Sequence, residues 1–259
     1  MSLLSPLRHH RVEKATGSGL RRSVRLLKLF RLEQTDPERF YASLAEDAVC
    51  QVAEYQDPAG LTVIDVGGAG GWFTAAFRAR GAHCYLVEPD TEQLRSGPAV
   101  RAGAVRAGAV IADGYWLPIR DGGADVTFCA NVLEHVRDPM GLLEEMIRAT
   151  RPGGLVYVSY TNWYSPWGGH EMSPWHYLGP RFAERRYIKR HQQSPKNHFG
   201  VSLFPLHIGP VLRALRARTD IEIADARPRY YPRWCRPLVR IPAAREVATW
   251  NLMVILRRT

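Results

Sequence analysis

LTVIDVGGAGGWFTAAFRARGAHCYLVEPD, residues 61–90, is the stretch that decides the fold. Its first six residues, Leu61–Val66, are apolar or β-branched apart from Asp65, which is typical of a buried strand in a parallel sheet. The glycine-rich run Gly67–Gly71 permits a tight turn and a close approach of a ligand to the backbone. Residues 72–80 then have the apolar spacing of a helix. The stretch therefore predicts a strand, a glycine turn and a helix in immediate succession.

A second strand, His83–Val87, follows this helix and ends on Glu88. Strand, glycine turn, helix, strand and acid together make a βαβ nucleotide-binding unit, whose turn offers backbone N–H groups and whose acid can bind ribose hydroxyls. A dinucleotide fingerprint would read Gly-x-Gly-x-x-Gly, but from Gly68 the third glycine falls on Phe73, and from Gly67 the second falls on Ala69. The pattern therefore favours a nucleotide-containing cofactor other than a dinucleotide.

The composition is that of a globular protein with a strongly basic balance. The chain has 259 residues, 46% of them hydrophobic and 23% charged, which is enough for a sizeable core. Its net charge of +10 comes almost wholly from arginine, which favours anionic partners or reflects compositional bias alone. Four cysteines without a Cys-x-x-Cys pair predict neither a disulfide framework nor a zinc site. The start lacks a signal-peptide pattern and no apolar run reaches the length of a membrane span, so we expect a cytoplasmic protein.

Two helices are expected ahead of the glycine turn, within an N-terminal segment of residues 1–60. Residues 1–18 form a basic leader. Residues 19–34 have an apolar arc opposite a basic one, so this helix either packs on the domain or lies on an anionic membrane. The second helix spans residues 37–55, with Asp36 as its cap and Pro37 in its first position.

The rest of the chain continues the alternation of strands and helices. Strands are expected at 110–112, 125–130, 155–160, 221–224 and 248–256, and helices at 91–95, 139–150, 181–191 and 210–218. Residues 100–110 contain VRAGA twice in tandem in a connecting loop. Polar residues end four strands (Asp65, Glu88, Asp113 and Asn131), and the carboxyl ends of parallel strands are where such sheets bind ligands.

The segments IADGYWLPIRDGGADVTFCANVLEHVRDP and IRATRPGGLVYVSY carry a family resemblance. Together with Asp-x-Gly-x-Ala-x-Gly at residues 65–71, they are similar in kind and order to the motifs of class I S-adenosylmethionine (SAM)-dependent methyltransferases. The chain also resembles actinobacterial methyltransferases of the type 11 group. The resemblance implies a Rossmann-like, doubly wound, mostly parallel seven-stranded sheet with an antiparallel last strand, and SAM as cofactor.

The resemblance also implies a role for each matching residue. Asp65 and the turn residues Gly67, Gly68, Ala69 and Gly71 would hold the methionine portion of SAM, with Ala69 in place of the middle glycine of the family pattern. Glu88 would bind the ribose hydroxyls. Asp113 and the backbone of Gly114 would read the adenine edge, and Asn131 would lie beside the methionyl carboxylate or the sulfonium.

Glu134 and His135 invite comparison with one branch of the family, the quinone-pathway O-methyltransferases. There a Glu-x-x-Glu-His sequence supplies metal ligands. In this chain Asn131 takes the place of the first glutamate, so one oxygen ligand is lost. We therefore expect no metal.

The stretch from Thr161 to Tyr177 is the candidate acceptor site. It holds three tryptophans, two tyrosines, two histidines and one glutamate between glycines and prolines, as expected of a loop that closes over a substrate. His170 is the first candidate for a catalytic base, His176 is the second, and Glu171 is a candidate orienting partner. In the alternative, the stretch is an aromatic mini-core whose histidines satisfy backbone groups.

The chain is thus expected to comprise the N-terminal segment and a methyltransferase core, residues 61–259. Two segments interrupt the core: a substrate-covering insertion, 161–200, and an irregular Arg/Pro/aromatic loop, 227–245, that either binds anionic or aromatic ligands or is a solvated connector.

The function expected from these residues is methyl transfer to a hydroxyl of a small-molecule, glycan or lipid-linked acceptor. RNA methylation is disfavoured, because Asn131-Val132-Leu133 lacks the Pro-Pro-aromatic continuation of exocyclic-amine methylases and no Pro-Cys nucleophile is present. A non-catalytic SAM-binding protein at a membrane surface is the other alternative. The sequence has no feature that predicts the oligomeric state.

Overall fold

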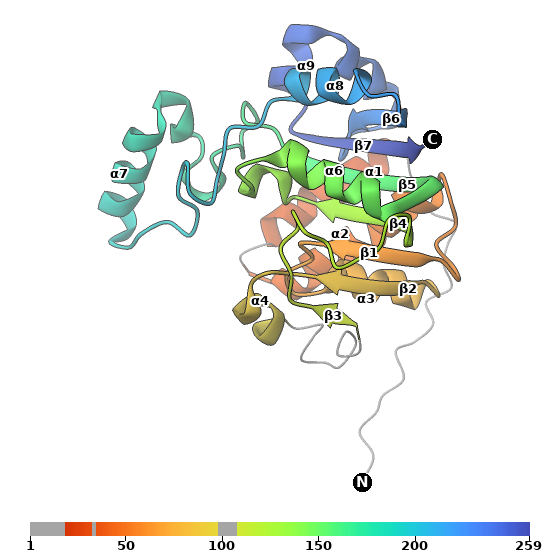
Figure 1. The fold of residues 1–259 in the computed structure, drawn as a ribbon. Helices are drawn as coiled ribbons and strands as arrows, with labels where there is room; N and C mark the ends of the chain where they lie inside the picture. Colours follow the sequence, from red (N-terminus) through yellow and green to blue (C-terminus); the bar gives the residue numbers. More distant parts are fainter. Residues whose placement is uncertain (1–18, 33–34, 98–107) are drawn as a thin grey trace.

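The computed structural model describes residues 19–32, 35–97 and 108–259. Within them a seven-stranded sheet has the order β3-β2-β1-β4-β5-β7-β6 (Figure 1). The strands are β1 (Thr62–Val66), β2 (His83–Val87), β3 (Ala109–Val110), β4 (Ala124–Ala130), β5 (Thr150–Thr161), β6 (Ile221–Pro228) and β7 (Asn251–Arg258). Strands β1 to β5 pair in parallel, and β7 lies antiparallel between β5 and β6. The predicted doubly wound sheet with an antiparallel last strand is confirmed.

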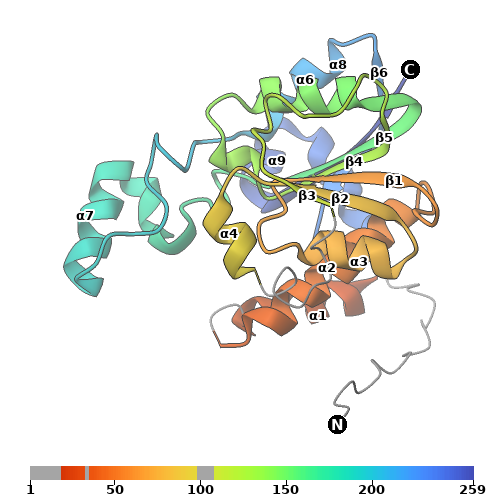
Figure 2. The same cartoon turned by 60° about the horizontal axis from the view of Figure 1, so that its bottom comes forward.

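Helices cover both faces of the sheet (Figure 2). On one face, α6 (Pro139–Ala149) and α8 (Ile208–Arg216) pack into the larger hydrophobic core. On the other face, α2 (Pro37–Ala53) and α3 (Trp72–Ala79) contribute Val49, Val52 and Phe77 to a second core. Because β1 lies between β2 and β4, the strand order reverses at the carboxyl end of β1, which is where open α/β sheets bind ligands.

The N-terminal helix packs on α2 rather than on the sheet. It comprises α1 (Leu20–Leu29) and a 3-10 turn, η1 (Phe30–Leu32). Leu26 and Leu29 are buried against residues of α2 and against Tyr230. Arg22 belongs to the basic arc of this helix, which the sequence predicts to lie opposite the packed apolar arc, but it pairs with the buried Asp47, with 2.6 Å between Arg22 Nε and Asp47 Oδ1. The prediction for Arg22 was wrong because a buried carboxylate on α2 provides its counter-charge.

Two further predictions were wrong in the second half of the chain. The strand expected at 155–160 begins earlier: residues 151–154, left between that strand and the expected helix 139–150, belong to β5, where the pairing with β4 shifts at a bulge. The expected irregular loop 227–245 contains the end of β6, a 3-10 helix, η5 (Arg233–Arg240), and most of α9 (Pro242–Ala248). Pro242 lies in the first turn of α9, where proline is compatible with a helix, whereas Pro237 lies inside η5.

The segment 161–200 leaves the sheet after β5. It forms two 3-10 turns, η3 (His170–Met172) and η4 (Trp175–Leu178), and the basic helix α7 (Pro180–His191). Helix α7 stands apart from the sheet (Figure 1). A short helix, α4 (Thr91–Ser96), follows β2. The basic leader and most of the VRAGA repeat lie outside the described residues.

Among residues 19–32, 35–97 and 108–259, no helix combines the length and the apolar character needed to cross a membrane.

Candidate active site

The glycine turn after β1 lies tightly against the ends of the neighbouring strands. Gly67, Ala69 and Gly71 all have positive φ angles, of 72°, 44° and 75°. A side chain at Gly68 would collide with the carboxylate of Asp65, and its Cβ would lie 2.5 Å from Leu86 Cδ1. The turn therefore needs minimal side chains, and Ala69 occupies a left-handed conformation that L residues adopt at a cost.

The carboxylate of Asp65 lies directly against the glycine turn. Its side chain is buried with 1% exposure, and Oδ2 accepts a hydrogen bond of 2.7 Å from Thr74 Oγ1 in α3. Burial raises the pKa of Asp65 to about 7; the hydrogen bonds from Thr74 oppose this shift and the nearby Glu88 adds to it. The carboxyl group thus titrates near neutral pH, directly behind the turn.

Glu88 joins the end of β2 to the same turn. Its Oε2 accepts a hydrogen bond of 2.9 Å from the backbone N–H of Ala69, and Oε1 accepts one of 3.0 Å from that of Asp90. The side chain is 5% exposed. The structure therefore brings together the turn and the acid that the sequence placed at the ends of adjacent parallel strands.

Asp113 and Gly114 lie on the next loop along this edge. Strand β3 ends at Val110, two residues before the expected end, so Asp113 belongs to a turn rather than to a strand end. Asp113 is exposed, and its Oδ1 accepts a hydrogen bond of 3.0 Å from the N–H of Tyr115. A Cβ at Gly114 would lie 2.5 Å from Leu142 Cδ1, so this loop is packed against α6.

Asn131 connects the ends of three strands. It has a positive φ of 58°, its N–H donates to the carbonyl of Ser159 at 2.7 Å, and its Oδ1 accepts from Asn251 Nδ2 at 2.8 Å. The next side chain, Val132, lies 2.7 Å from where a Cβ of Gly67 would be. Asn131 is therefore fixed beside the glycine turn by β5 and β7.

Arg229 is a buried cation beside Asn131 that the sequence did not single out. It follows β6, is 1% exposed, and donates from Nη1 to Ser159 Oγ at 2.9 Å. Its guanidinium lies 5.2 Å from the ring centre of Tyr230, and its buried Nε and Nη2 have no hydrogen-bond partner. A buried cation with unsatisfied N–H groups offers a counter-charge to an anionic group.

His170 enters the same edge from the insertion. Side chains at Gly168 and Gly169 would collide with Trp163 and His176, so the two glycines let the chain pass close to these residues. His170 itself has a positive φ of 50°. Burial lowers the pKa of His170; Glu134 and Glu171 oppose this shift, and His135 adds to it.

Glu134, His135 and His170 form a compact cluster, and the sequence did not predict their proximity. Their candidate ligand atoms all lie within 4.8 Å of one another, and the two imidazole rings are 4.8 Å apart between centroids. Glu134 accepts a hydrogen bond of 2.9 Å from the N–H of Thr161 at the end of β5. The cluster therefore lies at the carboxyl ends of β4 and β5, next along the chain from Asn131.

His176 and Glu171 are engaged within the insertion. His176 is 2% exposed, with Nε2 3.0 Å from the carbonyl of Trp163 and Nδ1 3.4 Å from Ser173 Oγ. Glu171 accepts hydrogen bonds of 2.7 and 2.9 Å from the N–H and Nδ2 of Asn197. These contacts position the loop that carries His170.

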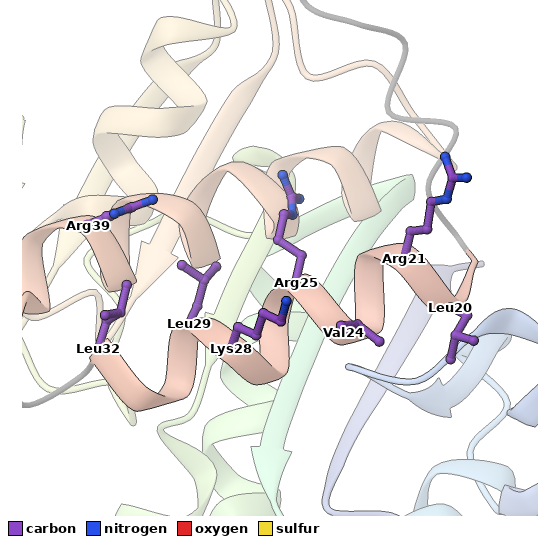
Figure 3. Close-up of a pocket in the computed structure, with 8 residues that line it drawn as sticks. All are labelled: Leu20, Arg21, Val24, Arg25, Lys28, Leu29, Leu32 and Arg39. Carbon is purple, nitrogen blue, oxygen red and sulfur yellow. The ribbon is translucent and has the colours of Figure 1, made fainter.

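A groove of about 660 Å³ runs along the outer side of α1 (Figure 3). Arg21, Arg25, Lys28 and Arg39 line it together with four apolar side chains, Leu20, Val24, Leu29 and Leu32. Leu20 and Val24 remain 64% and 41% exposed. The surface therefore combines positive charge with accessible apolar area.

Comparisons with known proteins agree with this arrangement. A family model described as a methyltransferase domain matches residues 37–194. An uncharacterized methyltransferase of Mycolicibacterium gilvum is 46% identical over 246 residues, which cover 93% of this chain and 95% of that protein. One from Mycobacterium leprae is 43% identical over 92% of this chain and 90% of its own length.

Solved structures show the same fold. A SAM-dependent methyltransferase from Mesorhizobium loti superposes with a TM-score of 0.58 at 22% identity, covering 84% of this chain and all of that one. The glycine turn, the acid after β2 and the polar strand ends fit a cofactor with a methionyl and a nucleoside part. On these grounds the chain belongs to the methyltransferase-domain family, and its methyl donor is S-adenosylmethionine.

Proposed function

We propose that the protein transfers the methyl group of SAM to a hydroxyl of a small-molecule, glycan or lipid-linked acceptor. The observation that carries this proposal is the cluster of the buried Glu134 with the half-buried His135 and His170, beside Asn131 at the sheet edge that holds the glycine turn. A hydroxyl must lose its proton during methylation, and imidazole is the side chain best suited to accept it.

In this proposal each loop at the sheet edge binds a different part of the cofactor. The turn 67–71, braced by Asp65, holds the methionyl part, and the carboxylate of Glu88 receives the ribose hydroxyls. Asp113 and the backbone of Gly114 bind adenine. Asn131 lies at the methionyl end, where the unsatisfied N–H groups of Arg229 offer a counter-charge to the methionyl carboxylate.

SAM supplies an electrophilic methyl group on a sulfonium, so the protein's task is to align the acceptor and exclude water. His170 takes the acceptor proton, while Glu134 stabilises the imidazolium that results. Trp163 and His176 pack edge to face at 5.1 Å between ring centroids and support the loop around His170. His176 and Glu171 act in this proposal by positioning that loop.

Affinity for SAM is expected to rise about three- to tenfold from pH 6 to pH 8. The pKa of Asp65 is raised to about 7, so its carboxyl is protonated below that pH. The ammonium and sulfonium charges of SAM favour the ionised Asp65 carboxylate, hence binding strengthens as pH rises through 7. Isothermal titration calorimetry across this range measures the effect.

The Asp65→Asn variant is the control, because the amino group of SAM titrates equally in both proteins. A variant with the same pH slope as the parent would rule out Asp65 as the titrating group.

The groove along α1 favours an acceptor held at a membrane surface, such as a lipid-linked compound. Exposed Leu20 and Val24 beside Arg21, Arg25 and Lys28 suit an anionic bilayer surface, where each cation contributes about 1 kcal/mol. Phe30, at the end of this segment, stacks on Trp167 of the insertion with 5.9 Å between ring centroids, so α1 lies next to the candidate acceptor site.

Replacing Arg21, Arg25 and Lys28 together by glutamate is expected to weaken binding to vesicles containing anionic lipid at least tenfold. Sedimentation at about 0.1 M salt measures this, and higher salt weakens the parent as well. Glutamate at Arg181, Arg185 and Lys189 of α7 makes the same change in net charge and serves as control. Equal losses in the two triple variants would show that net charge, rather than α1, determines binding.

The function itself is tested with methyl-labelled SAM and three bacterial fractions: a lipid extract, a glycan fraction and total RNA. We expect label in the lipid or glycan fraction as a base-stable methyl ether. Base-labile label would indicate a carboxyl acceptor, and label in RNA would favour the nucleic-acid alternative. Either result would overturn the hydroxyl proposal.

A further inference from the structure

We infer that Glu134, His135 and His170 form a binding site for a divalent transition-metal cation such as Zn²⁺. In the part of the chain that the structure describes, they are the group of three acidic, histidine or cysteine side chains close enough to hold an ion. Their ligand atoms lie within 4.8 Å of one another. Tetrahedral Zn²⁺ with bonds of about 2.0–2.1 Å places its ligand atoms about 3.3 Å from one another. Small rotations of the three side chains would therefore bring their ligand atoms to the spacing that Zn²⁺ requires.

Glu134 gives the strongest indication of a missing partner. The side chain is 2% exposed, and Oε1 is occupied by the N–H of Thr161. Oε2 is buried and has no hydrogen-bond partner, which is rare for a carboxylate oxygen inside a protein. A cation coordinated by Oε2 would satisfy this atom.

The two histidines are prepared for the same role. His135 Nδ1 lies 2.7 Å from the carbonyl of Ser202 and must carry the proton that this bond requires, so Nε2 keeps its lone pair. Such a bond to a backbone carbonyl is the usual outer-shell contact of a metal-binding histidine. His170 Nδ1 is buried without a partner, although the chain holds the residue in a left-handed conformation beside His135.

The ligand set indicates the kind of cation. Two imidazoles and one carboxylate suit Zn²⁺ or a related transition metal, whereas Mg²⁺ and Ca²⁺ prefer oxygen ligands. Three protein ligands leave a coordination position for an oxygen of the acceptor.

This inference rests on the proposed function and refines the role of His170. In the cation-bound enzyme His170 is a ligand, and the cation lowers the pKa of the acceptor hydroxyl. The hydroxyl proton passes to water, the oxygen forms its bond to the methyl carbon, and the carbon–sulfur bond of SAM breaks to leave S-adenosylhomocysteine.

The test is calorimetric titration of the full chain, stripped with a chelator, with Zn²⁺ and separately with Mg²⁺. We expect one saturable Zn²⁺ site that is at least tenfold weaker in each of the His170→Ala, His135→Ala and Glu134→Gln variants, and no comparable Mg²⁺ binding. His83→Ala, at an exposed position at the start of β2, is the control. A background with His9 and His10 replaced by alanine removes the adjacent histidine pair of the leader.

Circular dichroism verifies that each variant is folded. Absence of a saturable Zn²⁺ site, or an unchanged site in His170→Ala, would overturn the inference. If Zn²⁺ does not bind while His170→Ala still loses methyl transfer, the metal site fails and the proposed function stands. If Zn²⁺ binds as expected but no hydroxyl is methylated, the site stands and the proposed function fails.

Discussion

The His170→Ala variant is expected to lose methyl transfer by about a hundredfold to ten-thousandfold in kcat/KM, while its affinity for S-adenosylhomocysteine stays within about twofold. The physical reason is that His170 lies beside Glu134 and His135 at the sheet edge where the acceptor is proposed to bind. Without the imidazole, no base takes the proton of the acceptor hydroxyl. If a cation is bound, the substitution instead removes one of the three protein ligands of that cation. The cofactor turn is formed by other residues, so binding of the product persists.

Turnover of the acceptor identified with labelled SAM measures the first quantity, and calorimetry measures the second. His83→Ala is the matched control, because His83 is exposed at the amino end of β2, opposite the edge that holds the site. A His170→Ala protein that binds S-adenosylhomocysteine and retains parental turnover would remove His170 from the mechanism. Loss of both properties would indicate a folding defect, which the thermal unfolding midpoint detects.

The Glu88→Ala variant is expected to bind SAM more than a hundredfold more weakly. Hydrogen bonds to a charged group contribute about 1.5–3 kcal/mol each, and this carboxylate is proposed to accept two from the ribose. The substitution also releases the N–H groups of Ala69 and Asp90, both of which Glu88 holds. The glycine turn therefore loses its link to β2, and the site loses the group proposed to bind the ribose hydroxyls.

Calorimetry measures this affinity, and the SAM-dependent rise in the thermal unfolding midpoint provides a second readout. Glu222→Ala is the control, since Glu222 is exposed on β6 at the far edge of the sheet. Affinity for SAM within a few-fold of the parent in Glu88→Ala would exclude Glu88 as the ribose acceptor.

The local patterns were sufficient to predict most of the fold. Apolar runs of five to seven residues, helical spacing and the glycine turn gave the parallel strands and the helices between them, because these depend on neighbours in the chain. Strand ends were less predictable. Strand β3 stops at Val110 because only Leu86 and Val87 pair with it, and the bulge in β5 depends on its pairing with β4.

The same distinction applies to the two halves of the site. The meeting of Asp65, the glycine turn and Glu88, where the cofactor is proposed to bind, follows from sequence, since parallel strands necessarily bring their carboxyl ends to one edge. Arg229 could not be identified, because its burial results from contacts with distant segments, with Ser159 of β5 and with Arg22 of α1, which donates to the Arg229 carbonyl.

The aromatic, glycine-rich stretch around His170 was enough to predict it as a candidate base. Its neighbours Glu134 and His135 could not be predicted from the sequence. It lies 35 positions after His135 in the chain, and their meeting depends on how the insertion folds back over the end of β4. The sequence by itself determined a βαβ cofactor unit and the chemistry of methyl transfer, because both can be recognised from motifs of contiguous residues. Only the tertiary structure decided that Glu134, His135 and His170 lie together in one cluster, because contacts between distant segments are fixed by packing rather than by local pattern.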